Sequence, residues 1–187
     1  MSRFQYSSLL PVAPHYLSLL LFSGPMCRWV KPALGIYSRN GSTANNILLE
    51  DSGVSVFLDR NPTAKPSERW KMTCSNAVYG SPDGLIWHKI PTKSPTGPIQ
   101  HSDDTKPTGA WDPRLRKYVI FVRRDVSRGR CIGRCETTDF ANWESETPEG
   151  CPTVFCADSE DPIHLDGGLD VYTNAWTPYP SSETLCI

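Results

Sequence analysis

The chain has 187 residues, enough for one domain, and its 19 Lys and Arg nearly balance 20 Asp and Glu, giving a formal net charge of −1. The two signs are interspersed, so the chain lacks the positive field that attracts phosphates, and no nucleic-acid partner is expected. No apolar stretch approaches the roughly 20 residues that cross a bilayer, so no membrane partner is expected. The 17 Pro and 13 Gly indicate many turns and short strands.

Residues 1–23 are expected to form a ragged segment outside the main domain. An apolar run at 17–22 follows a single early Arg3, but it is short for a signal peptide's apolar region of about 7–15 residues. Two interpretations stay open, a weak secretory signal and a misassigned start of the gene. The compartment therefore stays open between extracellular and cytoplasmic.

A first unit of four strands is predicted at about 36–90. Residues 46–59 are typical of two strands across a turn, and 70–74, 77–79 and 86–90 supply further strand-like pieces around a Ser81-Pro-Asp-Gly84 turn. Ahead of them, Asn40-Gly41-Ser42 matches the pattern of an N-glycosylation acceptor. Asn-Gly is also the commonest tight hairpin turn, and the pattern favours the turn.

A second unit of four strands is predicted at about 103–146. Its strands are expected at 109–113, 117–123, 130–136 and 142–144. A long polar loop should follow at 146–162. A further unit should begin at about 166, with a strand at 169–176.

Three tryptophans mark a repeat along the chain. Trp29, Trp87 and Trp143 are separated by 58 and 56 residues, and the last two close a shared Ser/Thr-x-Asp-x-x-x-Trp pattern. Units of this length with four antiparallel strands are typical of propeller blades, and each Trp is expected in the last strand of its blade. A β-sandwich is the alternative that strand number alone allows.

The predicted fold class is therefore all-β, as part of a five-bladed β-propeller spanning 24–187. The chain should hold the end of one blade, two blades and the start of a fourth. Closed propellers typically need four to eight blades.

The chain resembles the five-bladed propellers related to glycoside hydrolase families 32 and 43, which include invertases, levanases, arabinanases and xylosidases. The resemblance covers about 24–180 and is carried by the segments 29–35, 40–46, 56–62, 68–71, 81–87, 104–119, 123–124 and 170–180. It implies hydrolysis of glycosyl bonds in an oligo- or polysaccharide by paired carboxylates, without a cofactor or metal.

The chain also departs from that family. It lacks the Trp-x-Asn-Asp-Pro-Asn-Gly pattern that carries the nucleophile of invertases, and Cys135-Glu136 reverses the order of the Glu-Cys acid motif. Two alternatives to an enzyme therefore stay open: a non-catalytic carbohydrate-binding or scaffold propeller, and an inactive product of a truncated gene.

Candidate catalytic carboxylates follow from the resemblance, which places three of them on the innermost strands of successive blades. The candidates are Asp59, then Asp104 with Asp112 as alternative, and Asp170 with Asp166 as alternative. Asp112 precedes Pro113 and is expected more often as the cap of a turn. Asp83 and Asp139 recur in the blade-closing turns and are expected to hold backbone N–H groups there.

Candidate substrate-binding residues are Trp111, Arg123 and Trp176. The two indoles offer flat faces to a sugar ring, although packing between blades is the commoner role of such a Trp. Arg123 can bind a carboxylate through its planar fork, and because side chains alternate along a strand, only one of Arg123 and Arg124 should face the core.

The seven cysteines cannot all pair within the chain. Cys131 and Cys135 lie about 13 Å apart on a strand, at ~3.3 Å per residue, which excludes a bridge between them. Cys151 and Cys156 flank a short loop and are candidates to pair with each other in an oxidising compartment. Scattered buried thiols are the more common arrangement.

Overall fold

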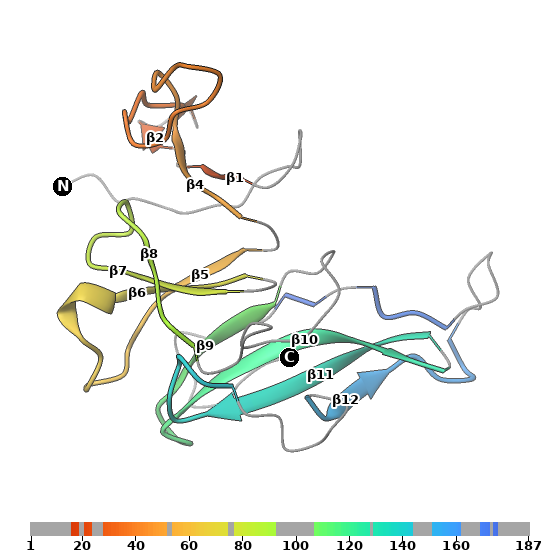
Figure 1. Cartoon of the computed structure of the whole chain (residues 1–187). Helices are drawn as coiled ribbons and strands as arrows, with labels where there is room; N and C mark the ends of the chain where they lie inside the picture. Colours follow the sequence, from red (N-terminus) through yellow and green to blue (C-terminus); the bar gives the residue numbers. More distant parts are fainter. Residues whose placement is uncertain are drawn as a thin grey trace.

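The computed structural model describes residues 31–51, 54–74, 77–92, 107–127, 129–143, 151–161, 169–172 and 174–175, together with the backbone of three short strands before residue 31. These residues form an all-β structure, as predicted, apart from one short 3-10 helix, η1 (Pro66–Glu68). Their strands make two four-stranded antiparallel sheets and two two-stranded ones (Figure 1). None of the described helical residues belongs to a helix long and apolar enough to cross a membrane.

The first four-stranded sheet is a meander, in which strands adjacent in the chain are adjacent in the sheet. Its order is β5 (Ser55–Leu58), β6 (Trp70–Thr73), β7 (Val78–Ser81) and β8 (His88–Lys89). A four-stranded sheet in this part of the chain is confirmed, although a fifth strand, β4 (Ile47–Glu50), also lies within the predicted unit and pairs elsewhere. The sheet begins at residue 55, however, later than the predicted unit at about 36.

The second four-stranded sheet is also a meander, built on a long hairpin. It contains β9 (Thr108–Asp112), β10 (Lys117–Val126), β11 (Gly129–Thr137) and β12 (Thr153–Cys156), and β10 pairs with β11 over nine positions.

The fourth strand of this sheet differs from the prediction. Residues 139–143 form a turn in which the Asn142 N–H donates to the Asp139 carbonyl, so the expected strand at 142–144 is wrong over 142 and 143. The chain instead returns later and pairs Cys156 with Cys131. Strand β12 therefore lies inside the segment predicted as a polar loop.

The strand before β5 pairs with the N-terminal part of the chain. Both strands predicted within 46–59 exist, but β4 (Ile47–Glu50) pairs with β1 (Tyr16–Ser18), whereas β5 pairs with β6. A further pair joins β2 (Leu21–Ser23) to β3 (Arg28–Val30). The segment expected to be ragged thus contains two strands. In Figure 1, β1, β2 and β4 lie beyond the first four-stranded sheet, against which β4 packs through Leu48, in a cluster with Met72 of β6.

The two larger sheets share one apolar core. Alternation along β10 places Tyr118, Ile120 and Val122 on one face, in a cluster with Val78 of β7 and Ile90. The opposite face carries Val119 and Phe121, against which Val171 packs. Phe57 of β5 contacts both clusters, because β5 lies beside β9.

The segment predicted to open another unit is irregular where it is described. Residues 169–172 and 174–175 are not in a strand, although the Val171 N–H donates to the Arg130 carbonyl at 2.9 Å. The segment thus joins the second sheet at the start of β11 and crosses to β9, where the Thr108 hydroxyl donates to the Asn174 side-chain carbonyl.

Candidate functional site

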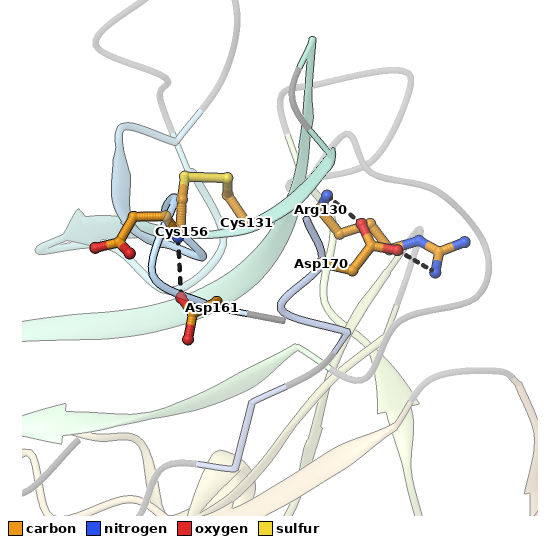
Figure 2. The surroundings of a disulfide bond; sticks show 6 residues. Arg130, Cys131, Cys156, Asp161 and Asp170 are labelled. Atoms are coloured by element: carbon orange, nitrogen blue, oxygen red, sulfur yellow. Dashed lines mark hydrogen bonds and ion pairs between the residues drawn. A yellow bond between two sulfur atoms is a disulfide. The ribbon is translucent and has the colours of Figure 1, made fainter. Parts of the chain in front are cut away.

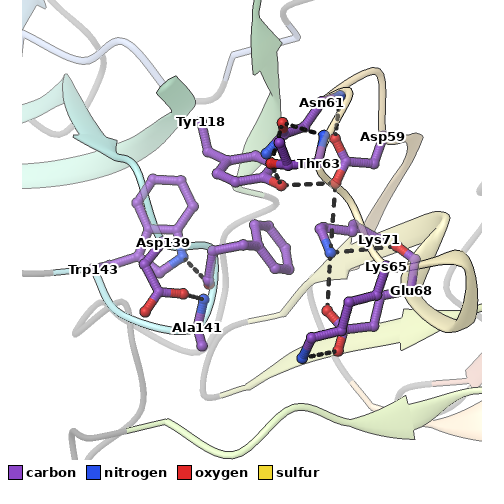
Figure 3. Close-up of polar contacts among 11 residues, drawn as sticks. Asp59, Asn61, Thr63, Lys65, Glu68, Lys71, Tyr118, Asp139, Ala141 and Trp143 are labelled. Carbon is purple, nitrogen blue, oxygen red and sulfur yellow. Dashed lines mark hydrogen bonds and ion pairs between the residues drawn. The ribbon is translucent and has the colours of Figure 1, made fainter. Parts of the chain in front are cut away.

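Asp59 lies at a fully buried junction between the two sheets. The residue directly follows β5, and its Oδ1 accepts the Asn61 N–H at 2.8 Å. Its Oδ2 accepts the Tyr118 hydroxyl at 2.8 Å and lies 3.5 Å from the Lys71 ammonium. Figure 3 shows these groups converging from the loop after β5, from β6 and from β10.

Lys71 is the cation of this cluster and is itself buried, 2 % exposed. Its Nζ lies 3.2 Å from a Glu68 carboxylate oxygen and 5.0 Å from the centre of the Phe140 ring. Burial favours a higher pKa for Glu68, but the nearby Lys65 and Lys71 charges outweigh burial and lower it. The ammonium is therefore paired with two carboxylates in a low-dielectric setting.

Tyr118 keeps its proton in this setting. Burial raises the pKa of its hydroxyl, the hydrogen bond from Asn61 opposes that shift, and the Asp59 carboxylate raises the pKa further. The hydroxyl can therefore donate to Asp59 at any physiological pH. Because both oxygens of Asp59 are engaged and none is exposed, the arrangement holds the two sheets together and offers no open carboxylate to a ligand.

Asp170 belongs to a second cluster, at the far end of the β10–β11 hairpin. Its Oδ1 accepts the Arg130 backbone N–H at 2.7 Å and its Oδ2 accepts an N–H of the Arg130 guanidinium at 3.2 Å (Figure 2). The Arg130 guanidinium lies 5.1 Å from the centre of the Tyr172 ring. That ring is 56 % exposed, so an aromatic surface is held beside an ion pair.

Gly129 permits the close approach that builds this second cluster. Its φ is +133°, and a Cβ at this position would lie 2.1 Å from the Leu169 carbonyl oxygen. A side chain at 129 would therefore push residues 169–170 away from β11.

Arg123 lies on the same face of the second sheet as Arg130. The register pairs Arg123 with Ile132 and Asp125 with Arg130, which brings these four residues to neighbouring positions. Arg123 is buried, 7 % exposed, and its Nε lies 3.7 Å from the Asp125 carboxylate. Two of the predicted site residues, Asp170 and Arg123, thus come to the same end of one sheet face.

Arg124 points to the opposite face and is half-buried. A Cβ at Gly133 would lie 2.5 Å from its Cγ, so the side chain occupies the space that this glycine leaves. The predicted alternation of the two arginines is confirmed, with Arg123 the more buried.

The remaining predicted site residues divide into two groups. Trp111 is buried, and its ring meets Tyr118 edge-on with centroids 4.9 Å apart, so it packs within the core. Asp104, Asp166 and Trp176 lie outside the described residues.

Three aspartates predicted to hold turns do so. Asp112 Oδ1 accepts the N–H groups of Arg114 and Leu115. The same roles are played by Asp83 for Leu85 and Ile86, and by Asp139 for Ala141. Burial alone would raise the pKa of Asp83, and the backbone N–H groups of Ile86 and Leu85 reverse this and lower it.

Two of the three repeated tryptophans close such turns. The indole N–H of Trp87 donates to the Gly84 carbonyl at 3.0 Å, and that of Trp143 donates to the Phe140 carbonyl at 2.9 Å, in each case three residues earlier. Trp29 lies in β3, but Trp87 immediately precedes β8 and Trp143 follows a turn. The prediction that each occupies the last strand of a blade is wrong for the last two.

Two disulfides cross-link the second sheet. Cys131 pairs with Cys156 and Cys135 with Cys151, with Cα atoms 4.5 and 4.9 Å apart (Figure 2 shows the first). The predicted Cys151–Cys156 pair and the expectation of scattered thiols are therefore wrong. Antiparallel pairing of β11 with β12 sets each cysteine opposite a partner from the other segment. Among the described cysteines, only Cys74 is free, and burial raises the pKa of its thiol.

Sequence reasoning missed Lys71, Tyr118 and Tyr172. One signal was available for Lys71, a lone charge inside the strand-like run Trp70-Lys-Met-Thr-Cys74. The described residues contain no group of three or more His, Cys, Asp or Glu side chains placed to hold a metal ion. No protein-family model, curated protein or solved structure matches the chain.

Proposed function

We propose that this chain is a non-catalytic carbohydrate-binding domain of the glycosidase-related propeller type, and that it binds sugar through the surface formed by Arg130, Asp170 and Tyr172. The observation that carries the proposal is the exposed Tyr172 ring held against an Arg130–Asp170 ion pair.

The chemistry of these three side chains suits a sugar. An aromatic ring presents a flat apolar face to the C–H groups of a pyranose or furanose, and the carboxylate and guanidinium accept from and donate to hydroxyl groups. Asp170 accepts one hydrogen bond from the Arg130 backbone N–H and one from its guanidinium, so the guanidinium is already held in place and loses less side-chain entropy when a ligand binds.

The arrangement of strands supports the propeller part of the proposal. Each four-stranded sheet is a meander, and each carries the same Asp-held turn with an indole hydrogen bond. Blades of a propeller are four-stranded sheets repeated along the chain, whereas sandwiches of the immunoglobulin type use Greek-key connections.

Glycoside hydrolysis is the second candidate function. The position of Asp59 favours it. Asp59 directly follows β5, the first strand of the first four-stranded sheet, and β5 lies beside β9, the first strand of the second four-stranded sheet. Hydrolysis needs two carboxyl groups across the scissile bond. In this alternative Asp59 would act with Asp104, because Asp170 lies at the far end of the β10–β11 hairpin, beyond the reach of a bond held at Asp59. A sugar would also have to displace the contacts of Asp59 with Tyr118 and Lys71.

One experiment separates the two functions. The whole chain is titrated calorimetrically with fructosyl, arabinosyl and xylosyl oligosaccharides, and the same samples are assayed for released sugar. We expect binding without hydrolysis, weakened at least tenfold by Tyr172→Ala, a loss of about 1.4 kcal/mol or more. Tyr172→Phe should retain most of the affinity because the ring remains.

The matched control is Phe155→Ala. Phe155 is 58 % exposed on β12, so its loss removes a similar aromatic surface elsewhere. Absence of binding, or equal loss from both alanine variants, contradicts the proposal. Sugar release by the unmodified chain selects hydrolysis instead.

A further inference from the structure

A tight hairpin at 39–42 stands before β4. Arg39 and Ser42 exchange two backbone hydrogen bonds of 2.9 and 3.0 Å. The two residues between them have positive φ, +51° at Asn40 and +78° at Gly41, as a type I′ turn requires. The predicted Asn-Gly turn is confirmed.

The tip of this hairpin is open to solvent. Asn40, Gly41 and Ser42 are all exposed, and a Cβ added at Gly41 would meet no atom within 4 Å. A large group attached to the Asn40 side chain would therefore not collide with the atoms around the adjacent glycine.

The sequence at the tip is also an acceptor pattern. Asn40-Gly41-Ser42 fits Asn-x-Ser/Thr with x other than Pro. Of the other six asparagines in the chain, only Asn61 has Ser or Thr at the second position, and Pro62 between Asn61 and Thr63 excludes it. Asn40 is therefore the single predicted attachment site for an N-linked glycan in this sequence.

The disulfides supply an independent observation. Cys131–Cys156 and Cys135–Cys151 are both formed, and such bonds persist in oxidising compartments such as the lumen of the endoplasmic reticulum. N-linked glycans are attached in that same lumen, so an oxidised chain and a modified acceptor belong together.

We propose that Asn40 is an N-glycosylation site. A bond forms between Asn40 Nδ2 and C1 of an oligosaccharide carried by a lipid pyrophosphate. The bond from that C1 to the donor's phosphate oxygen breaks, the lipid pyrophosphate leaves with the electron pair, and the amide nitrogen loses one proton. When the hairpin at 39–42 forms, the glycan on Asn40 is directed to solvent. This proposal is independent of carbohydrate binding at Tyr172.

The test expresses the full chain behind a secretory leader in a eukaryotic cell. Intact mass is measured before and after treatment with peptide N-glycosidase, which leaves Asp in place of a glycosylated Asn. We expect one glycan, with the Asn-to-Asp mass change on Asn40 in the tryptic peptide 40–60. Asn45 and Asn46, in the same peptide, are internal controls and should be unchanged.

Three variants test the acceptor pattern directly. Asn40→Gly keeps a residue suited to positive φ and should abolish the glycan without loss of folding. Ser42→Thr should preserve or raise occupancy, whereas Ser42→Ala should abolish it. A secreted, oxidised chain with unmodified Asn40, or a glycan that survives Ser42→Ala, would each overturn the proposal.

Discussion

Lys71 carries a charge into the apolar region between the two sheets, where carboxylates, ring faces and the Glu68 backbone carbonyl compensate it. Its ammonium contacts Asp59 and Glu68, and Asp59 in turn holds Tyr118. Such a cluster is costly to break on one side, because the remaining charge stays buried without a partner.

We expect Lys71→Met to lower the free energy of unfolding by about 3–5 kcal/mol. Asp59→Asn combined with Lys71→Met should cost less than the sum of the single changes, since neither charge is then left alone. Urea denaturation of the four proteins measures the coupling.

The control for that cycle is Lys65→Met. Lys65 also pairs with Glu68, at 3.1 Å, but its side chain is largely exposed, so the change should stay within about 0.5 kcal/mol. Equal losses of unfolding free energy in Lys71→Met and Lys65→Met would show that the buried ion pair stabilises the fold no more than the exposed one.

Whether the sequence predicts a residue's role depends on how far apart that residue and its hydrogen-bond partner lie along the chain. Asp83, Asp112 and Asp139 bind backbone N–H groups two or three residues away, so a local pattern suffices to assign their roles. Asp59 and Tyr118 are 59 residues apart, and only the packing of one sheet on the other reveals their contact.

Strand β11 is the element held most firmly, because two of its residues are cross-linked. Cys131 and Cys135 are four positions apart and point to the same face; Cys156 is the last residue of β12 and Cys151 lies just before that strand. A disulfide closing a loop of this length contributes about 3 kcal/mol by restricting the unfolded chain.

We expect reductant to lower the free energy of unfolding by about 3 kcal/mol or more. A variant with all four bridging cysteines changed to Ala should not respond, although it retains Cys74. Digestion of the oxidised chain with trypsin and chymotrypsin cuts between the two cysteines of each segment and identifies the pairs by mass. A linked Cys151–Cys156 peptide would contradict the structure.

Strand existence was easier to predict than strand pairing. The continuous apolar run of β10 and the clear β5–β8 pieces lie within short stretches of sequence, whereas β4 and β12 pair with strands across long connections. Pairing across a long connection depends on the register and on which edge of the sheet remains unpaired, and the sequence of the strand alone determines neither.

Phe57 is one of the side chains that join the two larger sheets. This side chain touches the clusters on both faces of the second sheet while belonging to the first, and its ring lies 5.8 Å from that of Phe140. Loss of one such side chain should weaken both sheets together.

Phe57→Ala should therefore lower the free energy of unfolding by about 3 kcal/mol. Amide hydrogen exchange should accelerate in β6–β7 and in β10–β11 alike. Leu58→Ala is the matched control, because Leu58 points to the other face and is exposed; its effect should stay below about 1 kcal/mol. Faster exchange confined to β6–β7 would show that the sheets unfold separately.

The two disulfides are nested, with the 135–151 loop lying inside the 131–156 loop. A single break in the backbone anywhere within 136–150 therefore releases no fragment, because the two pieces remain joined by both bridges. The cut molecule would keep β11 and β12 side by side and would come apart only on reduction. The connection between the third and fourth strands of the second sheet is thus one that the chain can lose to cleavage while its halves stay covalently together.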